Sequence, residues 1–372
     1  MLIEEDGMTF TFYPNHEEDA RKFFDTYEFA GFDFLITSER TGLKEKEQRI
    51  CRYCKKSYPQ VKFENKAHTI PEFLGNKYSI SDFECDTCNK LFGEYEKQLS
   101  NYFGLAIPAN RTKGKKKIPS ANSYDKKISA KRTDFFGAKT AIEIASTNNE
   151  VGNIQYNEAN DSLSLKFETE PYRPIDVYKA FLKMALGLMP EEFVEDYKLS
   201  FDILQKKELS EKLRDEMISV YVHNFDKAYN YNGIVLFKKK IDCTVLAPPF
   251  SMVLFYGQSM HQIYLPLQKE YLISRNGKKI TYPLLPPVLP EKNHETIKFS
   301  YVTERLDAAE NKTSTHYLSI VHTNPNEERV AIDFDGNLKE AAEFNSDKIT
   351  KIIIIDDPDF AIQIDKTKNI DG

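Results

Sequence analysis

Residues 51–93 carry the sequence CRYCKKSYPQVKFENKAHTIPEFLGNKYSISDFECDTCNKLFG. This stretch holds four of the five cysteines of the chain, arranged as two Cys-x-x-Cys pairs, Cys51/Cys54 and Cys85/Cys88. Zinc binds four thiolates tetrahedrally, and two such pairs supply them with the chain closed between the pairs. The gap between the pairs is longer than in a ribbon-type zinc site, so a functional loop fits there. We therefore predict a structural zinc site with no coordination position left for a substrate.

The composition predicts a globular protein of the cytoplasm. The chain has 372 residues, of which 41% are hydrophobic and 29% charged, so it is long enough for two domains and a sizeable core. The longest apolar run, IIII at 352–355, is far too short to cross a bilayer. The opening MLIEEDGMTF lacks the basic-then-apolar pattern of a signal peptide. In a reducing compartment, paired Cys-x-x-Cys motifs favour a metal over a disulfide.

The net charge of −6 does not by itself suggest a nucleic-acid-binding protein, but the charge is unevenly distributed. Residues 111–117, RTKGKKK, hold five basic side chains, and we predict that they contact backbone phosphates without reading sequence: Arg111, Lys113, Lys115, Lys116 and Lys117. The alternative interpretation is a solvated basic loop.

The fold class is predicted as α+β, with a small zinc-stapled module near the N-terminus and a larger mixed domain after it. Hydrophobic periodicity predicts a strand at MTFTFYP and a helix face through residues 20–27. It predicts a clear helix in PIDVYKAFLKMALGLMP, more helix in residues 191–225, and strands thereafter. The predicted segments are a lead-in (1–48), the module (49–104), a basic linker (105–135) and the C-terminal α+β domain (136–372).

Within the module, a short strand is expected to run from Lys62 to His68, and a helix from Cys88 onward. Asn89 and Glu96 are seven residues apart, so they project from one side of that helix. A lone histidine is usually structural. His68 differs because it lies between the two Cys-x-x-Cys pairs of the predicted zinc site.

The motifs CRYC, AHTIPEFLG and CDTCNKLFG, in this order, resemble the HNH (His-Asn-His, ββα-metal) endonucleases, specifically the branch with a four-cysteine zinc. The resemblance covers residues 49–104 and implies a ββα-metal nuclease module. It implies that His68 is the general base that activates water, a role that suits imidazole near pH 7. Asn89 matches the asparagine that orients the catalytic loop or helps hold a divalent cation. The implied cofactors are structural Zn²⁺ and a catalytic Mg²⁺ or Mn²⁺, and the implied substrate is DNA.

The sequence departs from this family at two positions. Many members carry Asp or Glu directly before the histidine, where this chain has Ala67. The last histidine of the motif is also missing, and the helix offers Glu94 and Glu96 instead. Because magnesium prefers oxygen ligands, Glu96 is our choice for the replacement, unless it is simply a solvated helix carboxylate. Weaker candidates are Glu72 and Glu84.

Three functional hypotheses follow. The first is a metal-dependent DNA endonuclease, in a layout that resembles uncharacterised bacterial HNH proteins associated with antiviral defence. Its residues 136–372 would recognise a target, an activating ligand or a partner protein, and a homo-oligomer would bring two sites to the two DNA strands. The second is a non-catalytic zinc module that binds nucleic acid or protein, which fits Ala67.

The third hypothesis, an active C-terminal domain, lacks a supporting motif. Its scattered histidines are expected to be structural or on the surface: His223, His261, His294, His316 and His322. Cys243 is expected to be an ordinary buried thiol.

Overall fold

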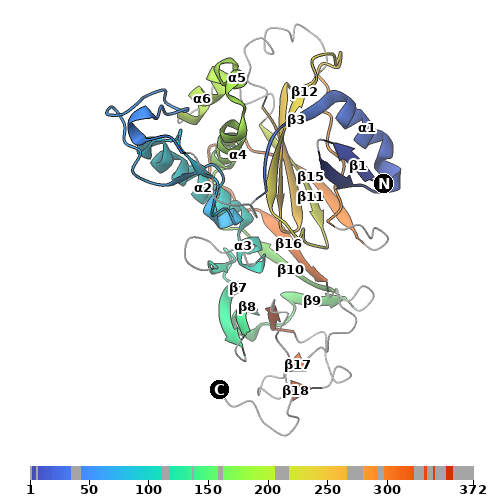
Figure 1. The fold of residues 1–372 in the computed structure, drawn as a ribbon. Coiled ribbons are helices and arrows are strands. Elements are labelled where there is room, and N and C mark those ends of the chain that lie inside the picture. Colours follow the sequence, from blue (N-terminus) through green and yellow to red (C-terminus); the bar gives the residue numbers. More distant parts are fainter. Residues whose placement is uncertain are drawn as a thin grey trace. The chain divides into compact units, whose positions relative to one another are not determined.

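The computed structural model describes residues 2–5, 7–34, 43–110, 118–135, 138–157, 162–205, 218–265, 280–290, 297–321, 331–332, 338–339 and 349–354. The described residues divide into two compact units (Figure 1). The first unit takes in the described parts of Met1–Phe103 and Pro171–Thr313. The second takes in the described parts of Gly104–Arg111, Ile118–Glu170 and Ser314–Gly372.

The first unit is built on a six-stranded antiparallel sheet in the order β15-β11-β14-β13-β12-β3. Its strands are β3 (Tyr27–Phe34), β11 (Ser219–Phe225), β12 (Gly233–Lys239), β13 (Phe250–Tyr256), β14 (Ser259–Leu265) and β15 (Phe299–Arg305). The central strand β13 is buried along its whole length, which indicates that both faces of the sheet are covered.

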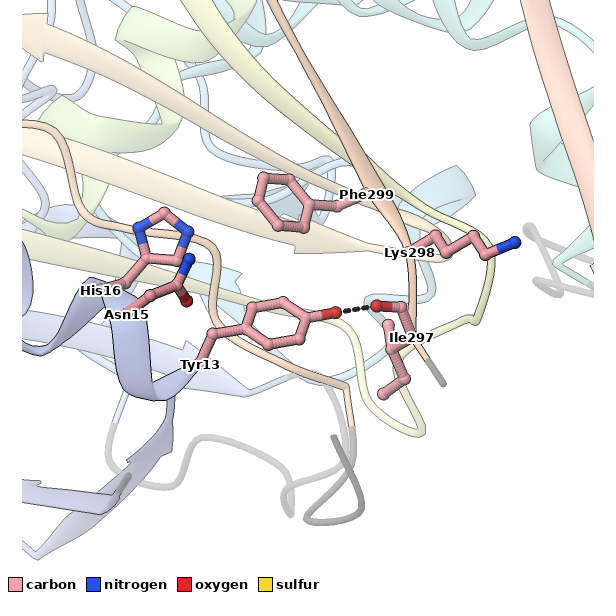
Figure 2. A pocket seen from close by; sticks show the side chains of 6 residues that line it. All are labelled: Tyr13, Asn15, His16, Ile297, Lys298 and Phe299. Carbon is pink, nitrogen blue, oxygen red and sulfur yellow. Dashed lines mark hydrogen bonds between the residues drawn. The ribbon is translucent and has the colours of Figure 1, made fainter. Parts of the chain in front are cut away.

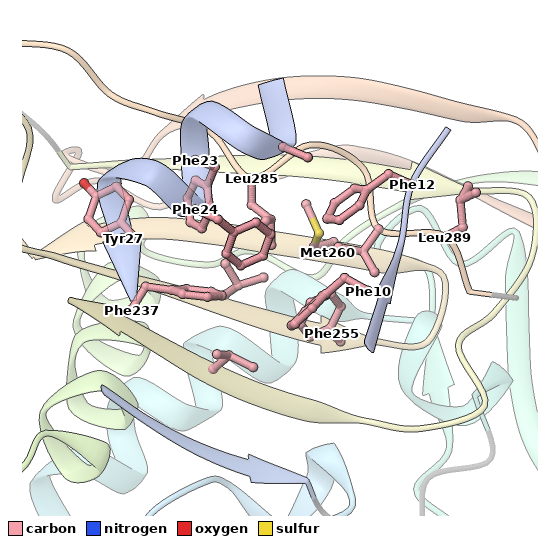
Figure 3. Packing of buried hydrophobic residues seen from close by; sticks show 14 of the residues in the cluster. Phe10, Phe12, Phe23, Phe24, Tyr27, Phe237, Phe255, Met260, Leu285 and Leu289 are labelled. Atoms are coloured by element: carbon pink, nitrogen blue, oxygen red, sulfur yellow. The ribbon is translucent and has the colours of Figure 1, made fainter. Parts of the chain in front are cut away.

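An aromatic core covers one face of this sheet (Figure 3). It is formed with helix α1 (Glu17–Thr26) and strand β2 (Met8–Thr11), which pairs with β1 (Leu2–Glu5). Phe23 and Phe24 from α1 meet Phe237 of β12, with ring centroids 5.0 and 6.3 Å apart.

Helices pack against the opposite face. Side chains alternate along a strand, so Phe255 of β13 belongs to the α1 core while the next residue, Tyr256, contacts Phe103 at 4.9 Å between centroids. On β14, His261 stacks with Phe181 at 5.9 Å. Phe103 and Phe181 come from the two longest helices, α2 (Asp86–Phe103) and α4 (Pro174–Leu188).

The remaining elements of this unit are short. The strands β4 (Ala67–His68) and β5 (Ile80–Ser81) pair with each other. The helical segments are η1 (Pro14–His16), η2 (Lys46–Gln48), η3 (Glu72–Leu74), α5 (Glu191–Val194), η5 (Glu195–Tyr197) and α6 (Lys198–Gln205). A search of the described residues for a helix with the length and apolar character of a membrane span finds none.

The second unit is mainly β-structure around a small core that includes Ile128, Ile142 and Leu165. One sheet has the order β19-β8-β7-β6 and another the order β16-β10-β9. The bounds are α3 (Ala106–Ala109), β6 (Ala121–Asn122), β7 (Ile128–Phe135), β8 (Ala138–Ser146), η4 (Thr147–Asn149), β9 (Ile154–Asn157), β10 (Ser162–Glu168), β16 (Thr315–Val321), β17 (Ala331–Ile332), β18 (Leu338–Lys339) and β19 (Lys351–Ile354).

The predicted α+β class is confirmed, as are α1, α4 and the strands of the C-terminal half. Two expectations about local structure are wrong. The helical pattern through residue 27 ends at Thr26, because Tyr27–Phe34 pairs with β12 as a sheet edge. The helix expected over 191–225 is confirmed in α5 and α6, and its residues 206–217 lie outside the described residues. It is wrong over Ser219–Phe225, where the β-branched and aromatic residues of β11 pair with β14 and β15.

The four-segment division of the chain stays a prediction. Composition predicts a linker over 105–135, yet within that range Ile128–Phe135 forms strand β7 and pairs with β8. The buried residues Ile128 and Ala130 alternate with polar ones, which is a strand pattern, but the prediction followed the high lysine content of the whole range instead. The basic residues 111–117 lie outside the described residues.

Replacing Phe237 with Ala tests the aromatic core of the first unit. Phe237 is fully buried among Phe23, Phe24 and Phe29, so Phe237→Ala should lower the free energy of unfolding by about 3–5 kcal/mol. Ile241→Ala, at a side chain 95% exposed, should change it by less than about 0.5 kcal/mol. Urea denaturation of both variants measures the difference, and equal losses would contradict the described core.

Candidate metal centre and active site

Four sulfur atoms meet at the predicted zinc site. The Sγ atoms of Cys51 and Cys88 are 3.7 Å apart, and those of Cys54 and Cys85 are 3.8 Å apart. A tetrahedron with Zn–S bonds of about 2.3 Å has S···S edges of about 3.8 Å, so the spacing fits zinc. A disulfide requires about 2.05 Å, and all four cysteines are free thiols. The residues present therefore fit a structural zinc ion.

The local fold brings the two cysteine pairs together. The first pair lies on a tight turn, in which Lys55 N–H donates to Cys51 O at 2.8 Å and Lys55 has a positive φ of 60°. The second pair lies at the start of α2. The side chain of Asp86 accepts hydrogen bonds from the backbone N–H groups of Glu64 and Asn65 at 3.0–3.2 Å. The start of α2 is thereby tied to the chain that leads from the first pair to His68.

His68 lies on the strand pair that precedes α2. Ala67 and His68 form β4, which pairs with β5 through His68 and Ile80, so the module has the order strand, strand, helix. Thr69 N–H donates to Ser79 O at 3.1 Å and extends this pairing by one residue. The predicted strand over 62–68 is thus shortened to two residues, because the chain before it is held by Asp86 instead.

A carboxylate lies beside the His68 imidazole. Nε2 of His68 is 3.6 Å from Oε1 of Glu72, and the two side chains are 15% and 34% exposed. Glu72 begins the η3 turn that follows Pro71. From the sequence alone, Glu72 is a weaker candidate cation ligand than Glu96, because spacing along the chain does not reveal that the η3 turn brings Glu72 back to His68.

Asn89 and Glu96 lie on α2, as predicted, and both are partly exposed. The side chain of Glu96 has a partner that the sequence did not predict, since its Oε1 lies 3.1 Å from Nζ of Lys183. Lys183 belongs to α4 and is fully buried. Its Nζ also lies 3.4 Å from Oε2 of Glu84, a second carboxylate, which is buried.

Lys183 also reaches the backbone of the His68 strand. Its Nζ donates a short hydrogen bond to the carbonyl of His68 and a longer one, 3.3 Å, to the carbonyl of Thr69. Burial acts to lower the pKa of Lys183, but Glu84 and Glu96 outweigh it and hold the pKa above its ordinary value. Burial raises the pKa of Glu84 to about 7, against the opposing effect of Lys183. The ammonium is therefore charged at neutral pH.

The C-terminal end of α4 also packs closely on the zinc module. A Cβ added at Gly187 would meet Cγ2 of Thr69 at 2.5 Å and the hydroxyl of Tyr53 at 3.3 Å, so glycine permits this approach. Nη1 of Arg52, from the first cysteine turn, donates to the carbonyls of Leu186, Gly187 and Met189 at 2.9–3.3 Å. Arg52 thus satisfies the terminal carbonyl groups of α4.

The described part of the chain places none of the other predicted residues at this site. Arg111, Lys113 and Lys115–Lys117 lie outside the described residues, as do His294 and His322. His223 and His261 are buried and His316 is half-buried, each on a strand outside the segment 51–103. The ring of His261 contacts Phe103 at the end of α2, with centroids 5.1 Å apart, on the face of the sheet that the helices cover. Cys243 is half-buried rather than buried, because it follows β12 in a turn with exposed neighbours.

An open pocket of about 450 Å³ lies elsewhere in the first unit (Figure 2). The rings of Tyr13, His16 and Phe299 gather there, with centroids 5.6–6.2 Å apart. Its other lining residues are Asn15, Ile297 and Lys298. None of the six belongs to residues 51–103, so this pocket is separate from the cysteine module.

Residues 51–103 match a family model described as HNH endonuclease. The match begins at the first zinc-site cysteine and ends at the last residue of α2. No curated protein and no solved structure matches the chain. The resemblance that the sequence predicted is therefore confirmed for this segment, while α4 and Lys183 lie outside it.

Zinc content tests the sulfur cluster. We expect one zinc per chain by elemental analysis, with Cys88→Ser losing the metal and most of the thermal stability of the module, because three thiolates bind zinc more weakly than four. Cys243→Ser is the matched control and should keep one zinc. Full zinc retention in Cys88→Ser would contradict the assigned ligands.

Two helical glycines test the close approach of α4. Gly187→Ala should lower the free energy of unfolding by about 1–3 kcal/mol, because its methyl group overlaps Thr69. Gly93→Ala on α2 has open space and should be neutral or stabilising by up to about 1 kcal/mol. Adding Thr69→Ser, which removes Cγ2, should restore part of the loss in Gly187→Ala. Equal effects of the two single variants in chemical denaturation would argue against this contact.

Proposed function

We propose that this protein is a metal-dependent endonuclease that hydrolyses DNA phosphodiester bonds. One observation carries the proposal. The residues that match the HNH endonuclease model fold as two short strands and a helix, with four sulfurs arranged for zinc and His68 outside that cluster. A histidine at such a place, with zinc fully coordinated by cysteine, is available for chemistry.

The geometry supports the following roles. His68 takes the proton from the attacking water, and Glu72, 3.6 Å from Nε2, orients the imidazole and stabilises its protonated form. Asn89 on α2 would hold the catalytic loop or help to hold the cation. Glu96 would be the carboxylate that holds the cation, although its Oε1 also lies 3.1 Å from Nζ of Lys183.

The fit of a catalytic Mg²⁺ or Mn²⁺ is looser than that of zinc. Among the described residues, only the four cysteines form a group of three or more metal-binding side chains that lie close together. Magnesium needs fewer protein ligands, since it binds through one or two carboxylates together with substrate phosphate and water. When bound, such a cation neutralises the scissile phosphate and stabilises the leaving 3′ oxygen.

The wider role is also part of the proposal. The basic residues 111–117 follow α2 in sequence, after the short helix α3, and suit contacts to DNA phosphates. We propose a cytoplasmic enzyme of bacterial defence, in which the chain after the module recognises a target, an activating ligand or a partner protein. Two copies acting together would cleave both DNA strands.

A second candidate function is a zinc module that binds nucleic acid or protein without cleaving it. The observation that favours it is Ala67, a buried apolar residue where many family members carry a carboxylate. The ion pair between Glu96 and Lys183 points the same way, because it occupies one oxygen of the expected cation ligand.

Plasmid nicking with Mg²⁺ or Mn²⁺, with and without EDTA, separates the two functions. His68→Ala should lower the cleavage rate by about 10²–10⁴-fold while zinc stays at one per chain, because general-base catalysis contributes on that order. His16→Ala is the matched control, since His16 lies outside the HNH segment, and it should cleave at the wild-type rate.

Glu72→Gln and Glu96→Gln in the same assay assign the carboxylates. Loss of a cation ligand should raise the Mg²⁺ concentration needed for half-maximal rate, whereas loss of an orienting partner lowers the rate at saturating Mg²⁺. Wild-type protein that binds DNA but cleaves no substrate with either metal would favour the second function. A His68→Ala variant that cleaves normally would overturn the role of His68.

A further inference from the structure

Lys183 occupies an unusual position in the molecule. Its ammonium is buried on an apolar helix, 115 residues along the chain from His68, and it contacts four groups of the zinc module. Two are the carboxylates of Glu84 and Glu96, and two are the carbonyls of His68 and Thr69. An unpaired buried ammonium is costly, so this site is built around the charge.

The contacts fall on both sides of the candidate catalytic segment. Glu84 directly precedes the second cysteine pair and Glu96 lies on α2, so one ammonium links the helix to the strand that carries His68. The carbonyl of His68 is fixed from one side by Lys183, while the pairing of His68 with Ile80 fixes the strand from the other. The backbone from which the imidazole projects is therefore held on one side by Lys183 and on the other by β5.

The close approach of α4 to the zinc module sets the position of the Lys183 ammonium. Gly187 lets the helix approach Thr69, and Arg52 holds the last carbonyls of α4 from the first cysteine turn. Lys183 lies one helical turn before Gly187 and so cannot move independently of that contact. A displacement of about 1 Å in a general base costs on the order of 10²-fold in rate.

We propose that Lys183 is a positioning residue for His68: its ammonium, held by Glu84 and Glu96, binds the carbonyls of His68 and Thr69 and sets where the imidazole stands. This inference rests on the proposed nuclease function for its catalytic consequence. Its structural content, that Lys183 fixes the His68 strand, stands independently and has its own measurement.

The test compares three variants of the full-length protein. Lys183→Met removes the donors and the charge, and Lys183→Gln keeps N–H donors without the charge. Lys179→Met is the matched control, because Lys179 is equally buried one turn earlier on α4 but pairs with Asp176 at 3.7 Å. Each variant is measured for plasmid-nicking kcat and KM, and for the hydrogen-exchange rate of the Thr69 amide, which donates to Ser79.

Lys183→Met should lower kcat by about 10- to 100-fold with KM within twofold, and should speed Thr69 exchange at least tenfold. Lys183→Gln should fall between Lys183→Met and wild type, and Lys179→Met should match wild type within twofold in both readouts. A merely structural role would move Lys183→Met and Lys179→Met alike, and that result overturns the proposal. Wild-type kcat and exchange in Lys183→Met overturn it too.

Two further outcomes are decisive. If Lys183→Met fails to fold, the same readouts on Lys183→Gln decide, and wild-type values there overturn the inference. If the wild-type protein cleaves nothing, the nuclease function fails, while the Thr69 exchange rates still decide whether Lys183 holds the His68 strand.

Discussion

The convergence of four cysteine sulfurs is the constraint on which the rest of the site depends. The first cysteine turn and the start of α2 must meet with their Sγ atoms 3.7–3.8 Å apart, so the start of α2 and the chain leading to His68 cannot move separately. Because cysteine fills every tetrahedral position, the zinc site has no position open for a substrate and its role is structural. The proposed chemistry is therefore assigned to His68, Glu72 and side chains of α2.

The module is larger than the segment that its sequence motif marks. Residues 51–103 carry the match, yet α4 completes the packing around His68 through Lys183, Gly187 and the carbonyls held by Arg52. In addition, α6 reaches the metal site, where Nε2 of Gln205 lies 3.5 Å from Sγ of Cys88. A zinc-bound thiolate gains from such a donor. The chain after the motif therefore supports the site as well as supplying strands β11 to β15 of the six-stranded sheet.

How far the sequence could predict this molecule depends on the range of each interaction. Cysteine spacing indicated the zinc site and an apolar stripe indicated α4, because both signals are local. Lys183 was missed, although a lysine on so apolar a helix is itself a signal of a buried partner. Its partners Glu84, Glu96 and His68 lie 87 to 115 residues away, and only folding brings them together. Strand β11 was predicted as helix for the same reason, and the predicted helix face extended one residue too far, into Tyr27 of β3, since pairing with distant strands overrode local periodicity.

The proposed function requires that four sulfurs alone hold the zinc and that His68 is not one of its ligands. The zinc K-edge X-ray absorption spectrum of the purified protein tests this most directly. The account predicts a single shell of four sulfur atoms at about 2.3 Å. A mixed shell that contains a nitrogen at about 2.0–2.1 Å would place histidine on the zinc and contradict the account, because His68 is the one histidine in the module.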